Sequence, residues 1–77
     1  MSKIKQKILD NFEDFHEAIH RLFGHHDVFD DLCHRYSRID DRLQGLSEDD
    51  PERSALLRRQ NEVEQEMLAV MGHDRRV

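Results

Sequence analysis

Histidine and glutamate side chains near the N-terminus spell a pattern that can hold a catalytic zinc ion. The stretch His16-Glu17-Ala18-Ile19-His20 places two histidines one helical turn apart, with a glutamate between them. Such histidines can chelate zinc while the glutamate activates a bound water. A protease site also needs a third protein ligand and an edge that binds the substrate. The sequence shows no strand for that edge, so the motif alone does not predict a protease.

Two further histidines follow this motif and extend the set of possible metal ligands. His25 and His26 come directly after Gly24, and a bend at that glycine could bring them near the first pair. Loops between helices collect such residues for solvation and helix capping, which is the interpretation we favour. The sequence therefore predicts no metal and no cofactor. The candidate ligands, should a metal bind, are His16, His20, His25 and His26.

Acidic side chains gather between two predicted helices and form a second cluster with possible chemistry. The cluster, here called the acidic tip, comprises Glu48, Asp49, Asp50 and Glu52. Some bacterial transcription factors use an acidic coiled-coil tip to reach a polymerase active centre and hold magnesium there, and this geometry is analogous. A simpler interpretation is that acids suit a helix N-terminus and a polar loop. We favour the simpler interpretation and keep a regulatory tip as the alternative.

Three segments with the apolar spacing of α-helices must position these side chains. The first helix is expected over about 11–23 and the second over about 28–46, with a break at Gly24. The third is expected over about 51–71, after a break at Gly45. The apolar residues of the first helix are Phe12, Phe15, Ile19, Leu22 and Phe23.

Capping residues mark where two of these helices begin. Asp27 is the expected N-cap of the second helix. Asp50, Pro51 and Glu52 supply the third with an N-cap, a first-position proline and a first-turn acid, which together are a strong start signal. Gly72 is expected to follow the last helical residue.

The second and third segments repeat apolar residues in the two-in-seven pattern of a coiled-coil seam. Their short connection allows only an antiparallel return, so the two seams face each other. Gln60 interrupts the seam, where it either fixes the register or lies at an exposed end. The expected fold is all-α: a single domain over 1–77, built as an antiparallel helical hairpin preceded by a shorter amphipathic helix. The expected seam comprises Phe29, Leu32, Tyr36, Ile39, Leu43, Leu46, Leu56, Val63, Met67 and Val70.

The hairpin segments share a set of residues with a known family, namely Phe29, Leu32, Tyr36, Ile39-Asp40 and Leu43, followed by Leu56, Arg58-Arg59, Val63 and Glu66-Met67-Leu68. With these residues the chain resembles the YdcH-like family, small bacterial proteins built on a domain of unknown function. The resemblance covers roughly 16–71. The chain departs from the family where it has Tyr36 in place of histidine, Ser47 near a usual glutamate, and Gln65 in place of aspartate. The resemblance implies a helical hairpin with a short leading helix, and it implies no activity.

The composition limits the kinds of function that the chain can carry. Of its 77 residues, 38% are charged and 36% are apolar, which is too thin a core to wall an enzyme cleft. No apolar run reaches the length of a membrane span. The net charge of −5 gives no bulk attraction to nucleic acid. Cys33 has no disulfide partner in the chain, and a lone cysteine fits the reducing cytoplasm.

A hairpin of two helices needs more buried surface than its own seam provides, because the cost of ordering the helices about cancels the combined gain from the seam, the helix hydrogen bonds and dispersion. The first helix can supply that surface in the same chain or in a second one. Leu9, Phe23, Leu57 and Leu68 lie beyond the seam, so we expect a homodimer or a larger helical bundle. The sequence thus predicts a non-enzymatic, self-associating interaction or scaffold module with an unidentified protein partner. The alternative is a regulator of transcription or translation that acts through the acidic tip.

Overall fold

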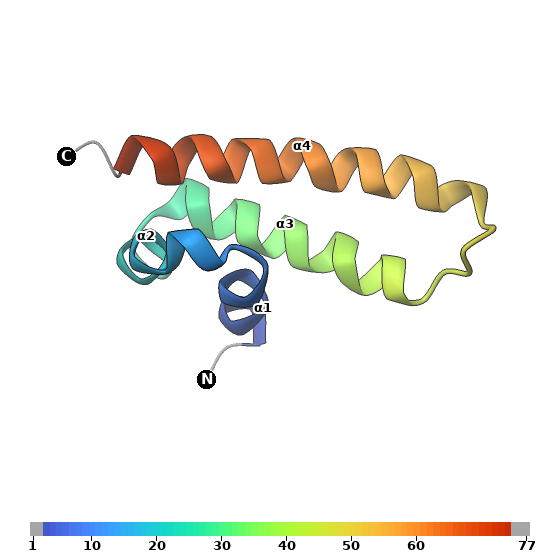
Figure 1. The fold of residues 1–77 in the computed structure, drawn as a ribbon, viewed down its shortest axis with the longest axis horizontal. Coiled ribbons are helices and arrows are strands. Elements are labelled where there is room, and N and C mark those ends of the chain that lie inside the picture. The colour runs from blue at the N-terminus through green and yellow to red at the C-terminus, as the bar shows by residue number, and fades with distance from the viewer. Residues whose placement is uncertain (1–2, 75–77) are drawn as a thin grey trace.

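The structure, a computed structural model, describes residues 3–74 and is helical throughout, which confirms the predicted fold class. Two long antiparallel helices lie side by side as the predicted hairpin, and a shorter N-terminal part packs against them (Figure 1). No strand occurs within the described residues. The predicted domain also included residues 1–2 and 75–77, which lie outside them. The elements in chain order are α1 (Lys3–Asn11), a 3-10 turn η1 (Glu13–Phe15), α2 (His16–Leu22), α3 (Asp27–Gln44) and α4 (Pro51–Asp74).

The start of α4 follows the capping signal in the sequence. The Asp50 carboxylate accepts a hydrogen bond from the backbone N–H of Glu52 at 2.9 Å, and Pro51 is the first helical residue. This arrangement satisfies an N–H that has no partner within the helix. The helix then runs through Gly72 instead of ending before it. A glycine ends a helix when its backbone takes the left-handed conformation. Gly24 has this conformation, with φ 84°, and Gly72 does not.

The start of α3 differs from the predicted one, because the N-cap is His26 and not Asp27. The His26 ring accepts a hydrogen bond at Nδ1 from the backbone N–H of Phe29, 3.1 Å away. Asp30, in the first turn, accepts another from the N–H of Gly24 at 2.8 Å. The helix ends at Gln44, two residues before the predicted limit. The turn before α3 is therefore held by hydrogen bonds to the side chains of His26 and Asp30.

The predicted first helix over about 11–23 corresponds to η1 and α2, which end at Leu22, but the prediction missed the bend at Phe12 and the separate helix α1 before it. Phe12 has φ −128° and ψ 60°, which no helix can contain, and it separates α1 from η1 and α2. The bend lets its ring meet Tyr36 of α3 edge to face, with ring centroids 5.6 Å apart. Asn11 adds a hydrogen bond from its amide to the Tyr36 hydroxyl at 3.2 Å. The break between α1 and η1 thus coincides with a contact to another helix.

One hydrophobic core joins all four α-helices of the described chain. The N-terminal helices pack in the same chain, because Ile8 of α1 and Ile19 of α2 are fully buried with residues of the hairpin. Lys7 on α1 also pairs with Asp40 of α3 at 3.0 Å. This packing answers the question of cis or trans that the sequence left open. The large side chains that are fully buried are Ile8, Ile19, Phe29, Cys33, Met67 and Met71.

Candidate functional site

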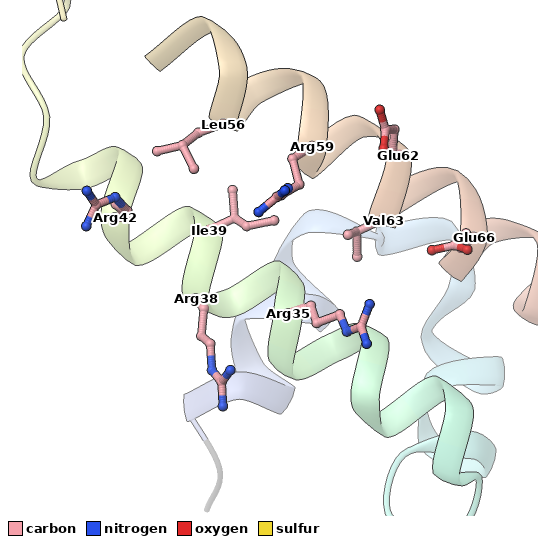
Figure 2. A pocket seen from close by; sticks show the side chains of 9 residues that line it. All are labelled: Arg35, Arg38, Ile39, Arg42, Leu56, Arg59, Glu62, Val63 and Glu66. Carbon is pink, nitrogen blue, oxygen red and sulfur yellow. The ribbon is translucent and has the colours of Figure 1, made fainter. Parts of the chain in front are cut away.

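A concave groove lies between α3 and α4. It has a volume of about 590 Å³. Tyr36 and Asp40, which contact α1, lie on the opposite side of α3 from Arg35 and Arg42, because each residue turns the helix by about 100°. The N-terminal helices therefore leave the groove open. The groove is lined by Arg35, Arg38, Ile39, Arg42, Leu56, Arg59, Glu62, Val63 and Glu66 (Figure 2).

The floor of the groove is apolar and shallow. Ile39 of α3 and Val63 of α4 meet there and are only 8% and 7% exposed, while Leu56 is half-buried. These side chains belong to the hairpin seam, so the groove lies directly over the contact between the two helices. A ligand would gain modest apolar burial from this floor, and most of its binding energy would have to come from the charged rim.

Arginine dominates the rim of the groove. Arg59 extends from α4 toward α3 across the floor, and it makes no hydrogen bond or ion pair within residues 3–74 (Figure 2). Arg35 pairs with Asp31 on its own helix at 2.9 Å. Arg42, near the turn, binds both carboxylate oxygens of Glu52 at 2.8 and 3.0 Å. Arg38 points away from α4 (Figure 2). The rim thus offers one uncommitted guanidinium and two in exposed ion pairs, which contribute little to stability and exchange easily.

Among the residues that line the groove, the acidic ones lie at one end only. Glu62 and Glu66 of α4 line the end that lies farther from the turn between the helices. Arg42 and Leu56 line the end near that turn (Figure 2). Arginine forms planar, bidentate hydrogen bonds with carboxylates and carries its charge at all physiological pH values. The arrangement can therefore bind an anion near the turn. The lining residues there are arginine and apolar side chains, which do not act as general acids or bases near neutral pH.

The four candidate histidine ligands do not converge. No group of three histidine, cysteine or acidic side chains within the described residues is placed to hold a metal ion. The His16 ring bonds the backbone carbonyl of Leu9 through Nε2 at 3.0 Å, and His26 caps α3. His20 and His25 are exposed. The zinc-like motif therefore provides a contact between α1 and α2 and leaves its glutamate, Glu17, on the exposed surface.

The acidic tip divides into two pairs with different surroundings. Asp50 caps α4, and Glu52 ties α4 to Arg42 of α3. Glu48 and Asp49 lie in the turn and are exposed. Two of the four acids thus have contacts that shape the turn, as the simpler interpretation of this cluster expects.

The predicted seam and first-helix residues form the interior of one chain. In the seam, Leu46, Leu56 and Val70 are half-buried and the others are buried; in the first helix, Phe15 and Phe23 are half-buried. Gln60 is half-buried, yet its Nε2 atom is enclosed and has no hydrogen-bond partner within the described residues. Among residues expected beyond the seam, Leu9, Phe23 and Leu68 pack against the core, and Leu57 is 47% exposed.

Two buried groups have pKa values that burial moves upward. Burial raises the pKa of the Cys33 thiol to about 12, with the nearby charge of Asp30 adding to the shift. Burial also raises the pKa of Tyr36, and the carboxylates of Glu64 and Asp40 act in the same direction. The Cys33 thiol stays protonated near neutral pH, so this thiol is not a nucleophile in the folded chain.

The arginine groove is the site that sequence reasoning missed, although a signal was present. Arg35, Arg38 and Arg42 follow one another at helical spacings of three and four residues, which places them along one side of α3. Arg59 joins them only because α4 returns beside α3. The net charge of −5 describes the whole chain and does not show this local excess of positive charge.

Comparisons with protein-family models, with curated proteins and with solved structures give no match to this chain. Within residues 3–74, no helix combines the length and the apolar character that crossing a membrane requires. The geometry of the groove therefore carries the functional argument.

Proposed function

We propose that this chain is a small, non-enzymatic protein-binding module whose binding surface is the groove between α3 and α4. The observation that carries the proposal is Arg59, an uncommitted guanidinium held over an apolar floor on a side of the hairpin that no other element covers. Arginine beside buried apolar residues is typical of the central contacts of protein interfaces. The groove is also open to solvent along one side and does not enclose a small substrate, which supports binding over catalysis.

The other expectations from the sequence remain proposals and have unequal support. Self-association is supported by Leu57 and Val28, the large apolar side chains that are most exposed, at 47% and 59%. Three of the four residues on which it was first based now pack within the monomer, which reduces that support. We also propose a cytoplasmic location, based on the lone cysteine, and membership of the YdcH-like family, based on the hairpin residues.

The proposal is tested by affinity capture with the full-length chain from a lysate of its source cells. The groove variant carries Arg42→Glu and Arg59→Glu, both exposed positions whose change leaves the core untouched. The matched control is Arg58→Glu, an exposed arginine next to Arg59 that does not line the groove. A further variant, Glu48→Gln with Asp49→Asn, tests the alternative of a regulator that acts through the acidic tip.

We expect a protein that is retained by the wild type, the Arg58→Glu control and the tip variant, and lost with the groove variant. Loss with the tip variant alone would instead favour the regulatory alternative. Retention by all four chains, or by none, would contradict the groove as the binding surface. Sedimentation at increasing protein concentration reports self-association separately from these outcomes.

A further inference from the structure

We propose that the groove accepts an acidic, amphipathic helical segment of a different protein, with its carboxylates placed over the half of the groove near the turn. This inference rests on the proposed function and specifies the chemistry of the partner. Arg42 and Arg59 supply positive charge at that half, and Ile39 with Leu56 supplies an apolar surface between them.

Charge fixes where the acids of the partner must lie. Arg59 has no partner among the described residues, and Arg42 keeps one nitrogen outside its pair with Glu52, because only its Nε and one terminal nitrogen donate there. A carboxylate can bind Arg59 in the bidentate geometry that makes such pairs strong, and Arg42 can add a hydrogen bond through its remaining nitrogen. At the far end of the groove Glu62 and Glu66 would repel an acid. The segment therefore carries its negative charge at one end only.

A helix fits the shape of the groove better than an extended strand. Two antiparallel helices leave a groove into which a third helix packs, as in helical bundles and in helix-in-groove complexes. Arg35 and Arg42 are seven residues apart on α3, which is about 10.5 Å or two helical turns. Acids three or four residues apart on a bound helix would span the distance between neighbouring arginines, with apolar residues between them facing the floor.

A second copy of this chain fits the same groove poorly. Arg53 bonds the Leu43 carbonyl, so α3 and α4 are level at these residues, and Arg38 and Arg59 then lie at nearly the same height along the hairpin. A two-fold axis along the hairpin would place Arg38 of one copy against Arg59 of the other. A two-fold axis across the hairpin would place the α3 arginines against each other. Both arrangements oppose arginines of the two copies over a floor that is already nearly buried, and only the first offsets this by bringing Arg35 of one copy level with Glu62 of the other.

Nucleic acid also fits less well than an acidic helix. A phosphate backbone presents uniform negative charge, whereas this groove carries Glu62 and Glu66 at one end and apolar side chains along its floor. Two accessible guanidinium groups also give few phosphate contacts for a chain whose net charge is −5.

The test is selection from a displayed library of random peptides of about 16 residues, about 24 Å as a helix, with the full-length chain as bait. Selection on the Arg42→Glu, Arg59→Glu chain removes peptides that bind elsewhere. Selected peptides are then synthesised, and their affinities for the wild type, Arg59→Glu and Arg58→Glu are measured by fluorescence anisotropy at low and high salt. Circular dichroism checks that each variant is folded.

We expect selected peptides to carry two or three acids at spacings of three, four or seven within one half, with apolar residues on the same face. Arg59→Glu should weaken their binding at least about tenfold, and Arg58→Glu less than about twofold. Selected peptides that are apolar or basic, yet still lose affinity in the groove variants, would overturn this inference and leave the proposed function intact. If the selection yields no peptide whose binding depends on the groove residues, that result would contradict both this inference and the proposed function. Displacement of the peptide by a single-stranded RNA oligonucleotide at equal concentration would overturn the inference in favour of nucleic acid.

Discussion

The two halves of the hairpin are packed very differently, although both helices run through each of them. The base half, residues 27–38 and 61–74, contains Phe29, Cys33, Met67 and Met71, which are all fully buried. The tip half, residues 39–60, contains no large side chain that is fully buried, and its Leu46 and Leu56 are half-exposed to solvent. The N-terminal segment explains the difference, because α2 contacts α4 at the base, whereas α1 meets the tip half at the exposed edge of α3, where Lys7 pairs with Asp40 and Asp41 (Figure 1).

Because of this difference, the residues that stabilise the fold and the residues proposed to bind a partner lie mainly in different halves of the hairpin. The base half holds most of the close-packed core, whose loss would be costly. The tip half has Arg42 and Arg59 of the groove, the acidic turn and a polar side chain inside the seam. Binding surfaces are commonly drawn from regions of lower local stability, and here the less packed half is also the half with uncommitted charge.

The largest expected effect comes from truncating matched residues in the two halves of α4. Met67→Ala in the base half removes a fully buried side chain, and we expect a loss of about 2–5 kcal/mol in the free energy of unfolding. Leu56→Ala in the tip half removes a half-buried side chain of similar volume, and we expect about half that loss or less. Urea unfolding followed by circular dichroism measures both. Equal losses would show that the tip is packed as well as the base.

A smaller effect of opposite sign is expected at Gln60. Its Nε2 atom is enclosed without a partner, and an unpaired buried donor costs about 1–3 kcal/mol. Gln60→Leu should therefore raise the free energy of unfolding by about that amount, as measured by urea unfolding. Gln65→Leu, at an exposed position of the same helix, is the control and should change it little. Destabilisation by Gln60→Leu would mean that Gln60 fixes the register of the two helices, as one interpretation of the sequence holds.

The sequence predicted those features that depend on local chemistry. The cap of α4 needs only Asp50 and its next residues, and its start was predicted correctly. The bend at Phe12 brings its ring to Tyr36, which is distant in sequence, and apolar spacing predicted neither this bend nor the separate α1 before it. The arginine groove depends on how α4 is aligned with α3. Periodicity indicates which residues share a side of one helix, but it does not give the relative height of two helices.

The smallest expected effect tests whether the base half excludes solvent. The pKa of the Cys33 thiol rises from 9.0 to about 12 because the thiol is buried. The folded protein then holds this proton more tightly than the unfolded chain does. The resulting stability is fully present below about pH 9 and is lost as the pH rises from about 9 toward 12. At pH 10 we expect a loss of about 1.4 kcal/mol from this thiol relative to pH 7.

The measurement is urea unfolding at pH 7 and pH 10 for the wild type and for Cys33→Ala. The raised pKa of Tyr36 acts in the same direction, but it is present in both chains and cancels in the comparison. The variant should therefore lose less stability between the two pH values, whatever its own stability at pH 7. If both chains lost the same amount, hydroxide would reach the thiol in the folded state. The base half would then be as open as the tip, and the proposed division between a closed core and an open binding surface would fail.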